Sequence, residues 1–218
     1  QVLSNLEVQN RLITNLEQIL HQRGYNGIDV DFEFIFPEDA ELYAKFIHQL
    51  AKRLNPQGLS VTVALAPKTS ADQPGVLYEG HNYALLGQAA NDVFLMTYEW
   101  GYTYGPPMAV APLNGVRRVV EYALTEIPSQ KLWLGIPNYG YDWTLPFVKG
   151  QSKATSISNP YAVELARKYG AEIQYDQTAQ SPWFRYYDEN KREHEVWFED
   201  ARSIRAKLAL IPEYQLHG

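Results

Sequence analysis

The 218-residue chain contains no cysteine, and this absence removes several classes of site at once. Disulfide frameworks, cysteine nucleophiles and thiolate metal sites are excluded, and the redox state of the protein's compartment leaves no trace in the sequence. Positive charge is also scarce, because 19 Lys and Arg stand against 25 Asp and Glu, for a formal net charge of −6. This acidic balance argues against nucleic acid or an anionic membrane as the main partner.

Long hydrophobic runs are missing as well. The longest, such as residues 61–67, are far too short to span a bilayer, and the N-terminal residues lack the basic and apolar regions of an export signal. No phosphate-binding glycine loop or dinucleotide fingerprint occurs, and the five histidines are scattered without metal-ligand spacing. We therefore expect no cofactor and no metal, and any export signal would lie outside this chain.

What the chain does contain is an ordinary folded composition with many aromatic residues. Apolar residues make up 45% and charged residues 20%, which excludes a disordered, collagen-like or coiled-coil chain. Aromatic residues reach 13%, and many of them lie in the glycine- and proline-rich segments 100–107 and 139–146. Two interpretations stay open at this point: a platform for the flat face of a sugar, or a large aromatic core.

Helical and strand patterns alternate along the first two thirds of the chain. Helices are predicted at residues 5–23, 38–55, 81–90 and 115–127, and strands at 27–36, 59–66, 92–97 and 131–137. Short apolar strands separated by helices predict an α/β fold with a parallel sheet, like consecutive turns of a (β/α)8 TIM barrel. A closed barrel needs eight strands and about 250 residues. The four strands found here indicate either an open sheet or an excerpt of a longer protein.

The pattern changes after residue 143. A helix is predicted at residues 161–169, antiparallel strands at 171–177, 182–188 and 194–198, and a helix at 200–210. This pattern is typical of a small α+β insertion. We therefore expect a partial barrel over residues 1–145, an insertion over 146–200, and a return to a barrel helix over 201–218.

The strongest chemical signal is a row of acidic residues on the first predicted strand. Asp29, Asp31 and Glu33 share one face, about 7 Å apart, because side chains alternate along a strand. The other face is apolar: Ile28, Val30, Phe32 and Phe34. Since the neighbouring strands are apolar, the row should face the barrel interior, where crowded like charges raise the pKa of at least one carboxyl. Glu33 lies nearest the carboxyl end of the strand, where barrels place their active sites, and could act as a general acid. A structural role and a divalent-metal site are the alternatives.

At these residues the sequence resembles a known family. Residues 27–33 resemble the D-G-x-D-x-D-x-E signature of glycoside hydrolase family 18, the chitinase-like enzymes, with Asn26 in place of the first Asp. Residues 96–99 resemble the family's M-x-Y-D motif, with Glu99 in place of Asp, and residues 134–140 resemble its G-x-P-x-Y-G motif. The resemblance implies a TIM barrel covered from about the third helix to the helix before the eighth strand.

Segments 24–27, 96–101 and 196–200 look most like the bacterial spore and cell-wall branch of that family. The resemblance implies a glycosidase whose partner is a polysaccharide containing N-acetylglucosamine, in peptidoglycan or spore cortex, and a location outside the cell, at the wall or the spore. A chitinase with the same machinery is one alternative. A non-catalytic sugar-binding protein on the same fold is the other.

The resemblance also implies roles for individual residues in a retaining, substrate-assisted reaction. Glu33 would protonate the leaving oxygen and later activate water, while the substrate's own acetamido oxygen attacks. Asp31 would orient the acetamide group, Asp29 would pair with Asp31, and Tyr98 would donate its hydroxyl to the acetamido oxygen. Substrate-binding positions would be Met96, Thr97, Glu99, Tyr139 and Trp143. For Tyr139 and Trp143, packing within a loop is the alternative.

Overall fold

The computed structural model describes residues 2–218, which form two compact units. Unit 1 contains residues 2–96, 119–134 and 215–218, and unit 2 contains residues 97–118 and 135–214. No helix within residues 2–218 combines the length and the apolar composition that crossing a bilayer requires.

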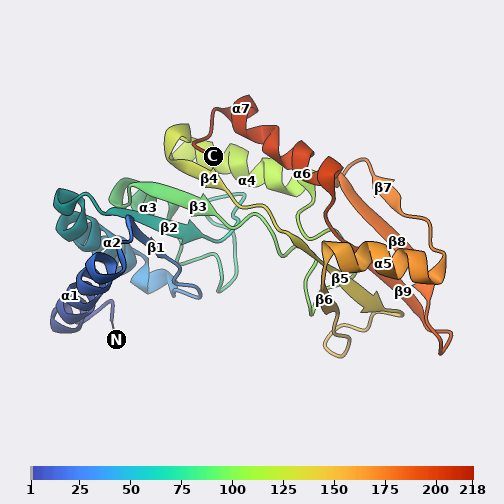
Figure 1. Ribbon diagram of the computed structural model, residues 1–218. Coiled ribbons are helices and arrows are strands. Elements are labelled where there is room, and N and C mark those ends of the chain that lie inside the picture. The colour runs from blue at the N-terminus through green and yellow to red at the C-terminus, as the bar shows by residue number, and fades with distance from the viewer. Residues whose placement is uncertain (1) are drawn as a thin grey trace. The chain divides into compact units, whose positions relative to one another are not determined.

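Unit 1 is built on a parallel sheet of four strands in sequence order: β1 (Gly27–Val30), β2 (Ser60–Leu65), β3 (Asp92–Leu95) and β4 (Leu132–Leu134). Figure 1 shows these strands side by side in the N-terminal part of the molecule. The connecting helices are α2 (Ala40–Leu54), α3 (Tyr83–Ala89) and α4 (Leu113–Glu126). The predicted α/β pattern is confirmed. The sheet is open rather than a closed barrel within the described residues, and His217 and Gly218 add backbone hydrogen bonds along β4.

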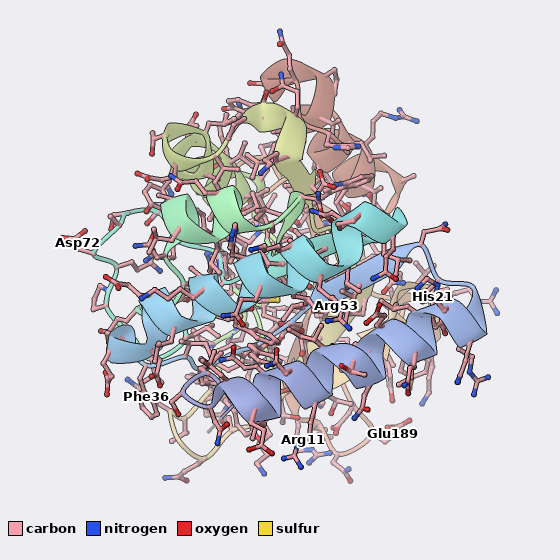
Figure 2. All side chains as sticks on the ribbon, turned by 90° about the vertical axis from the view of Figure 1, so that its left-hand side faces the viewer. Arg11, His21, Phe36, Arg53, Asp72 and Glu189 are labelled. Carbon is pink, nitrogen blue, oxygen red and sulfur yellow. The ribbon has the colours of Figure 1, made fainter. Side chains whose placement is uncertain are left out.

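The first helix, α1 (Leu6–Arg23), begins and ends where the sequence predicts. The side chain of Asn5 accepts hydrogen bonds from the backbone N–H groups of Glu7 and Val8, and Gly24 ends the helix with a φ of 68°. Figure 2 shows α1 lying beside α2, with Arg53 between them. The Arg53 guanidinium there pairs with Glu17 of α1 at 3.0 Å.

Side chains of the parallel sheet divide into a helix-covered face and a bare face. The covered face is apolar, and all its residues except the partly buried Ile28 are buried. The buried ones are Val30, Val61, Val63, Leu65, Val93, Leu95, Leu132 and Leu134. These residues pack with the buried stripe of α2, which includes Phe46, Ile47 and Leu50. The opposite face carries Asp29, Thr62, Phe94 and Trp133, and no described helix covers it. One side of the sheet in unit 1 is therefore left without a covering helix among the described residues.

Unit 2 holds an antiparallel sheet of five strands in the order β6-β5-β9-β8-β7. Its strands are β5 (Tyr139–Thr144), β6 (Thr155–Ser158), β7 (Gln174–Asp176), β8 (Ser181–Tyr187) and β9 (Glu193–Trp197). Its helices are α5 (Asn159–Tyr169), α6 (Ala201–Leu208) and α7 (Leu210–Tyr214), and α5 packs on one face of the sheet. Unit 1 also contains short 3-10 turns at Pro37–Asp39, Asn55–Gln57 and Ser129–Lys131.

The predicted α+β region is confirmed, but two of its strands escaped prediction. β5 falls in the glycine- and proline-rich segment 139–146, and its partner β9 lies more than fifty residues later in the chain. β6 pairs only with β5 among the described strands, so neither strand shows in a local pattern. The turn at residues 188–190 connects β8 to β9. Asp188 holds it by accepting hydrogen bonds from the backbone of Asn190 and Arg192.

Candidate active site

The acidic segment, residues 29–35, begins on β1 and continues beyond the carboxyl end of that strand. Pairing with β2 ends at Val30, so Asp29 lies on the strand while Asp31 and Glu33 follow it. The prediction of a strand reaching residue 36 is wrong, because Phe34 adopts a φ of 55°, outside the extended region. The expectation that Phe34 fills the core is also wrong, since its side chain is 59% exposed.

Asp29 faces the bare side of the parallel sheet. The register places it opposite Thr62, and Thr62 opposite Asp92. Together with Ser60, Phe94 and Trp133 these side chains line a shallow hollow on that face. The hollow combines carboxylates and hydroxyls with two aromatic rings, and this mixture suits a polar ligand that also has an apolar face.

Partial desolvation and mutual repulsion change the acidity of the row. The side chains of Asp29, Asp31 and Glu33 are all exposed in the described part of the chain, where the sequence predicts an enclosed interior. The pKa values of Asp29 and Glu33 are nevertheless raised, first because neighbouring protein atoms replace part of their solvent and second by the negative charge of Asp31. The sequence anticipated the direction from like charges alone, and the larger cause is the partial desolvation. Glu33 therefore keeps its proton to a higher pH than an ordinary glutamate, which a general acid requires.

The backbone of the acidic segment is held from the core side. The Phe32 ring stacks on Tyr43 at 5.6 Å and on Phe46 at 5.8 Å, both on α2. A ring nitrogen of His81 lies 2.8 Å from the carbonyl oxygen of Phe32. No local pattern in the sequence singles out His81, because its partner is 49 residues away and the histidines are irregularly spaced.

A second group of predicted site residues, residues 96–99, directly follows β3. Met96 is the last residue of a segment of unit 1, and residues 97–99 belong to unit 2. Met96 and Thr97 are buried, and the Thr97 hydroxyl donates to the carbonyl oxygen of Gly135 at 2.7 Å. Tyr98 is half-buried and packs against an aromatic cluster that includes Tyr141. Packing therefore holds the side chains of Met96 and Tyr98, and a hydrogen bond holds that of Thr97.

Glu99 is the polar centre of this cluster. Its backbone has a φ of 66°, in the left-handed region that a non-glycine residue seldom adopts. Its carboxylate accepts hydrogen bonds from the hydroxyls of Tyr139 at 2.6 Å and Tyr141 at 3.0 Å. Burial, followed by Glu99, raises the pKa of Tyr139. The structure thus brings Glu99 and Tyr139 together, as the sequence predicted for one site, and adds Tyr141, which the sequence had not singled out.

Trp143, unlike Glu99 and Tyr139, is almost completely buried. Its side chain is 1% exposed, and its indole N–H donates to the carbonyl oxygen of Gly105 at 2.8 Å. The packing alternative therefore describes Trp143 in this structure better than a sugar contact. Tyr139 keeps part of its surface in contact with solvent.

Within residues 2–218 no group of three or more His, Asp or Glu residues is arranged to hold a metal ion. The sequence model of one family, "Glycosyl hydrolases family 18", matches residues 1–218. The chain belongs to glycosyl hydrolase family 18.

Proteins similar to this chain include enzymes from species of Bacillus. The chain is 48% identical over 217 residues to the "Cortical fragment-lytic enzyme" of Bacillus subtilis (strain 168), covering all of this chain and 50% of that protein. The crystal structure of the Bacillus megaterium QM B1551 spore cortex-lytic enzyme SleL matches with a TM-score of 0.94 and 51% identity, over 100% of this chain and 50% of that one. A chitinase from Chromobacterium violaceum ATCC 12472 matches with a TM-score of 0.91 and 29% identity, over 98% of this chain and 66% of that one.

The chain thus spans about half the length of the curated relative and of the SleL structure. Membership of family 18 and the chitinase likeness imply a TIM-barrel-like architecture, of which the described residues contain four parallel strands.

Proposed function

We propose that the protein containing this chain hydrolyses β-1,4-linked N-acetylglucosamine glycans of peptidoglycan or spore cortex, at the cell wall or the spore. The observation that carries the proposal is the raised pKa of Glu33 at the carboxyl end of a parallel strand, in a chain of family 18. The names of the similar proteins from Bacillus favour cortex as the substrate. The chain would extend from the third barrel helix to the helix before the eighth strand, with residues 146–200 as the insertion.

In the proposed reaction Glu33 protonates the leaving glycosidic oxygen and then activates water. Family 18 is known for substrate-assisted catalysis, so the acetamido oxygen of the substrate is the nucleophile and the product keeps the β configuration. Asp31 orients the acetamide and stabilises the positive charge that develops, while Asp29 pairs with Asp31. Tyr98 donates its hydroxyl to the acetamido oxygen, and Glu99 and Tyr139 contact the sugar. Met96 and Thr97 belong to the same site, and Thr97 acts through its buried hydrogen bond to Gly135 rather than by direct contact.

The role of Glu33 is tested with Glu33→Gln in the complete protein. We expect kcat to fall by about 10²–10⁴, the usual contribution of a general acid. Glu38→Gln, which changes an exposed glutamate five residues later, should leave kcat unchanged. A loss in Glu33→Gln of less than about tenfold would contradict the acid role.

The substrate is tested by digesting purified spore cortex, vegetative peptidoglycan and chitin with the complete protein. Mass spectrometry of the fragments identifies the cleaved bond, and we expect cortex to be cleaved fastest. Faster cleavage of chitin would favour a chitinase instead. Early detection of the inverted anomer by NMR would exclude the acetamide nucleophile.

A further inference from the structure

The acidic segment leaves the sheet at Val30, and the side chain of His81 fills the gap that opens there. The ladder between β1 and β2 ends at the pair Val30 and Val63. Beyond it, Nε2 of His81 lies 2.8 Å from the carbonyl oxygen of Phe32, and Nδ1 lies 2.9 Å from the backbone nitrogen of Ala66. The imidazole ring thus joins the two chain segments where their backbones no longer bond to each other.

These contacts define the protonation of the ring. The backbone N–H of Ala66 can only donate, so Nδ1 of His81 must accept and the proton resides on Nε2, which donates to Phe32. The side chain is 0% exposed, and burial lowers the pKa of His81, as does the neighbouring Lys68, while the Phe32 carbonyl and Asp31 oppose them. A second proton would set two donors against each other at Ala66, so this geometry favours the neutral ring.

Gly80 supports the same segment at its other end. A Cβ atom on Gly80 would lie 2.1 Å from the carbonyl oxygen of Ile35, so only glycine permits this approach of the two backbones. The Gly80–His81 dipeptide therefore contacts the acidic segment on both sides of Glu33, at Phe32 and at Ile35.

We propose that His81 is a positioning residue for Glu33. Its ring fixes the peptide group between Phe32 and Glu33 and, with Gly80 against Ile35, sets the direction in which the Glu33 carboxyl points. The catalytic consequence rests on the proposed role of Glu33 as the acid. A displacement of about 1 Å at a reacting group can cost about 100-fold in rate, which makes one buried hydrogen bond significant.

Two substitutions in the complete protein separate the two hydrogen bonds of the ring. In His81→Gln the amide nitrogen can take the place of Nε2 and donate to Phe32. In His81→Asn the amide oxygen can take the place of Nδ1 and accept from Ala66, but no donor reaches Phe32. We expect kcat of the Asn variant to fall by about 10- to 100-fold with little change in KM, and the Gln variant to stay near wild type. The alkaline limb of the pH profile, which reports Glu33, should shift in the Asn variant only.

A control removes two other buried hydrogen bonds nearby. The hydroxyl of Tyr83 donates to the carbonyl oxygen of Ala66 and accepts from the backbone N–H of Lys68, and it has no hydrogen bond to Phe32. Tyr83→Phe should therefore lower the melting temperature while kcat and the pH profile stay unchanged. Equal kcat values for the Asn and Gln variants, or an equal loss in Tyr83→Phe, would overturn the positioning role. If the Asn variant does not fold, the Gln variant decides alone, because a kcat below about one tenth of wild type contradicts the proposal.

Crystal structures of both variants give a result that needs no turnover. We expect the Phe32 carbonyl to be displaced in His81→Asn and kept in His81→Gln. An unmoved segment in the Asn variant would overturn the proposal even if the protein hydrolyses glycans. Displacement of the segment in a protein that cleaves no N-acetylglucosamine glycan would support the positioning role and overturn the proposed function instead.

Discussion

At the scale of single residues, the chemistry depends on how the carboxyl groups of the acidic segment influence one another. Asp31 lies between Asp29 and Glu33 in the sequence, and its charge is the second cause that raises the pKa of each. Raising the pKa of an acid favours its protonated form in the folded protein. The middle carboxylate therefore helps to keep the proton on the terminal one.

Replacing Asp31 by Asn tests this influence. Asp31→Asn removes the negative charge while the partial desolvation remains, so the pKa of Glu33 falls and Glu33 loses its proton at a lower pH. We expect the alkaline limb of the kcat/KM profile to move toward lower pH, together with a lower maximum rate. Asp92→Asn, on the same face of the sheet but not among the charges that shift Glu33, is the control and should leave the limb in place. A limb that stays or moves to higher pH in Asp31→Asn would refute the coupling.

At the scale of elements, α6 is attached to unit 2 by a buried ion pair. Lys207 of α6 and Glu199, which follows β9, meet at 2.8 Å, and both side chains are 0% exposed. The helix begins with a capping box in which Asp200 and Ser203 each accept a hydrogen bond from the other's backbone N–H. Cap and ion pair together determine where α6 begins and which of its sides faces the sheet.

Breaking this pair should be costly, because the remaining charge is left buried without an opposite charge. We expect Lys207→Met to lower the free energy of unfolding of the complete protein by about 3–5 kcal/mol. The double variant Glu199→Leu with Lys207→Met should recover most of the loss, since an apolar pair of similar volume needs no charge compensation. Urea unfolding measures both. A single variant within about 1 kcal/mol of wild type would show that the pair contributes little.

At the scale of the whole chain, the parallel sheet of unit 1 has helices on one face and, within residues 2–218, none on the other. Parallel sheets are ordinarily covered on both faces. Here the bare face includes Trp133, which is 39% exposed, and β1 has a neighbouring strand on one side only. Open edges and exposed aromatic rings favour association with other chains.

The isolated 218-residue chain should therefore associate. We expect its apparent mass in light scattering to increase with concentration, and Trp133→Lys on the bare face to reduce this increase. The complete protein should keep one mass over the same range. An isolated chain that remains monomeric throughout would mean that the face and the edge are protected in another way.

The sequence by itself determined the α/β alternation, the ends of α1, the α+β character of residues after 143, and the acidic row with its family. These features depend on local patterns, such as apolar periodicity, capping residues and a fixed motif, which a linear sequence displays directly. The raised pKa of Glu33 was also foreseeable in direction, since like charges two residues apart repel in any extended segment.

Only the tertiary structure decided where β1 ends, that Phe34 turns outward, that Trp143 is buried, and that β5 pairs with β9. Each of these depends on which backbone groups come within hydrogen-bond distance after folding. His81 shows the reason most clearly, because the carbonyl it binds lies 49 residues away and no local pattern links the two. Periodicity shows which side of an element is apolar, while the partner of each polar group is chosen by the packing of distant segments.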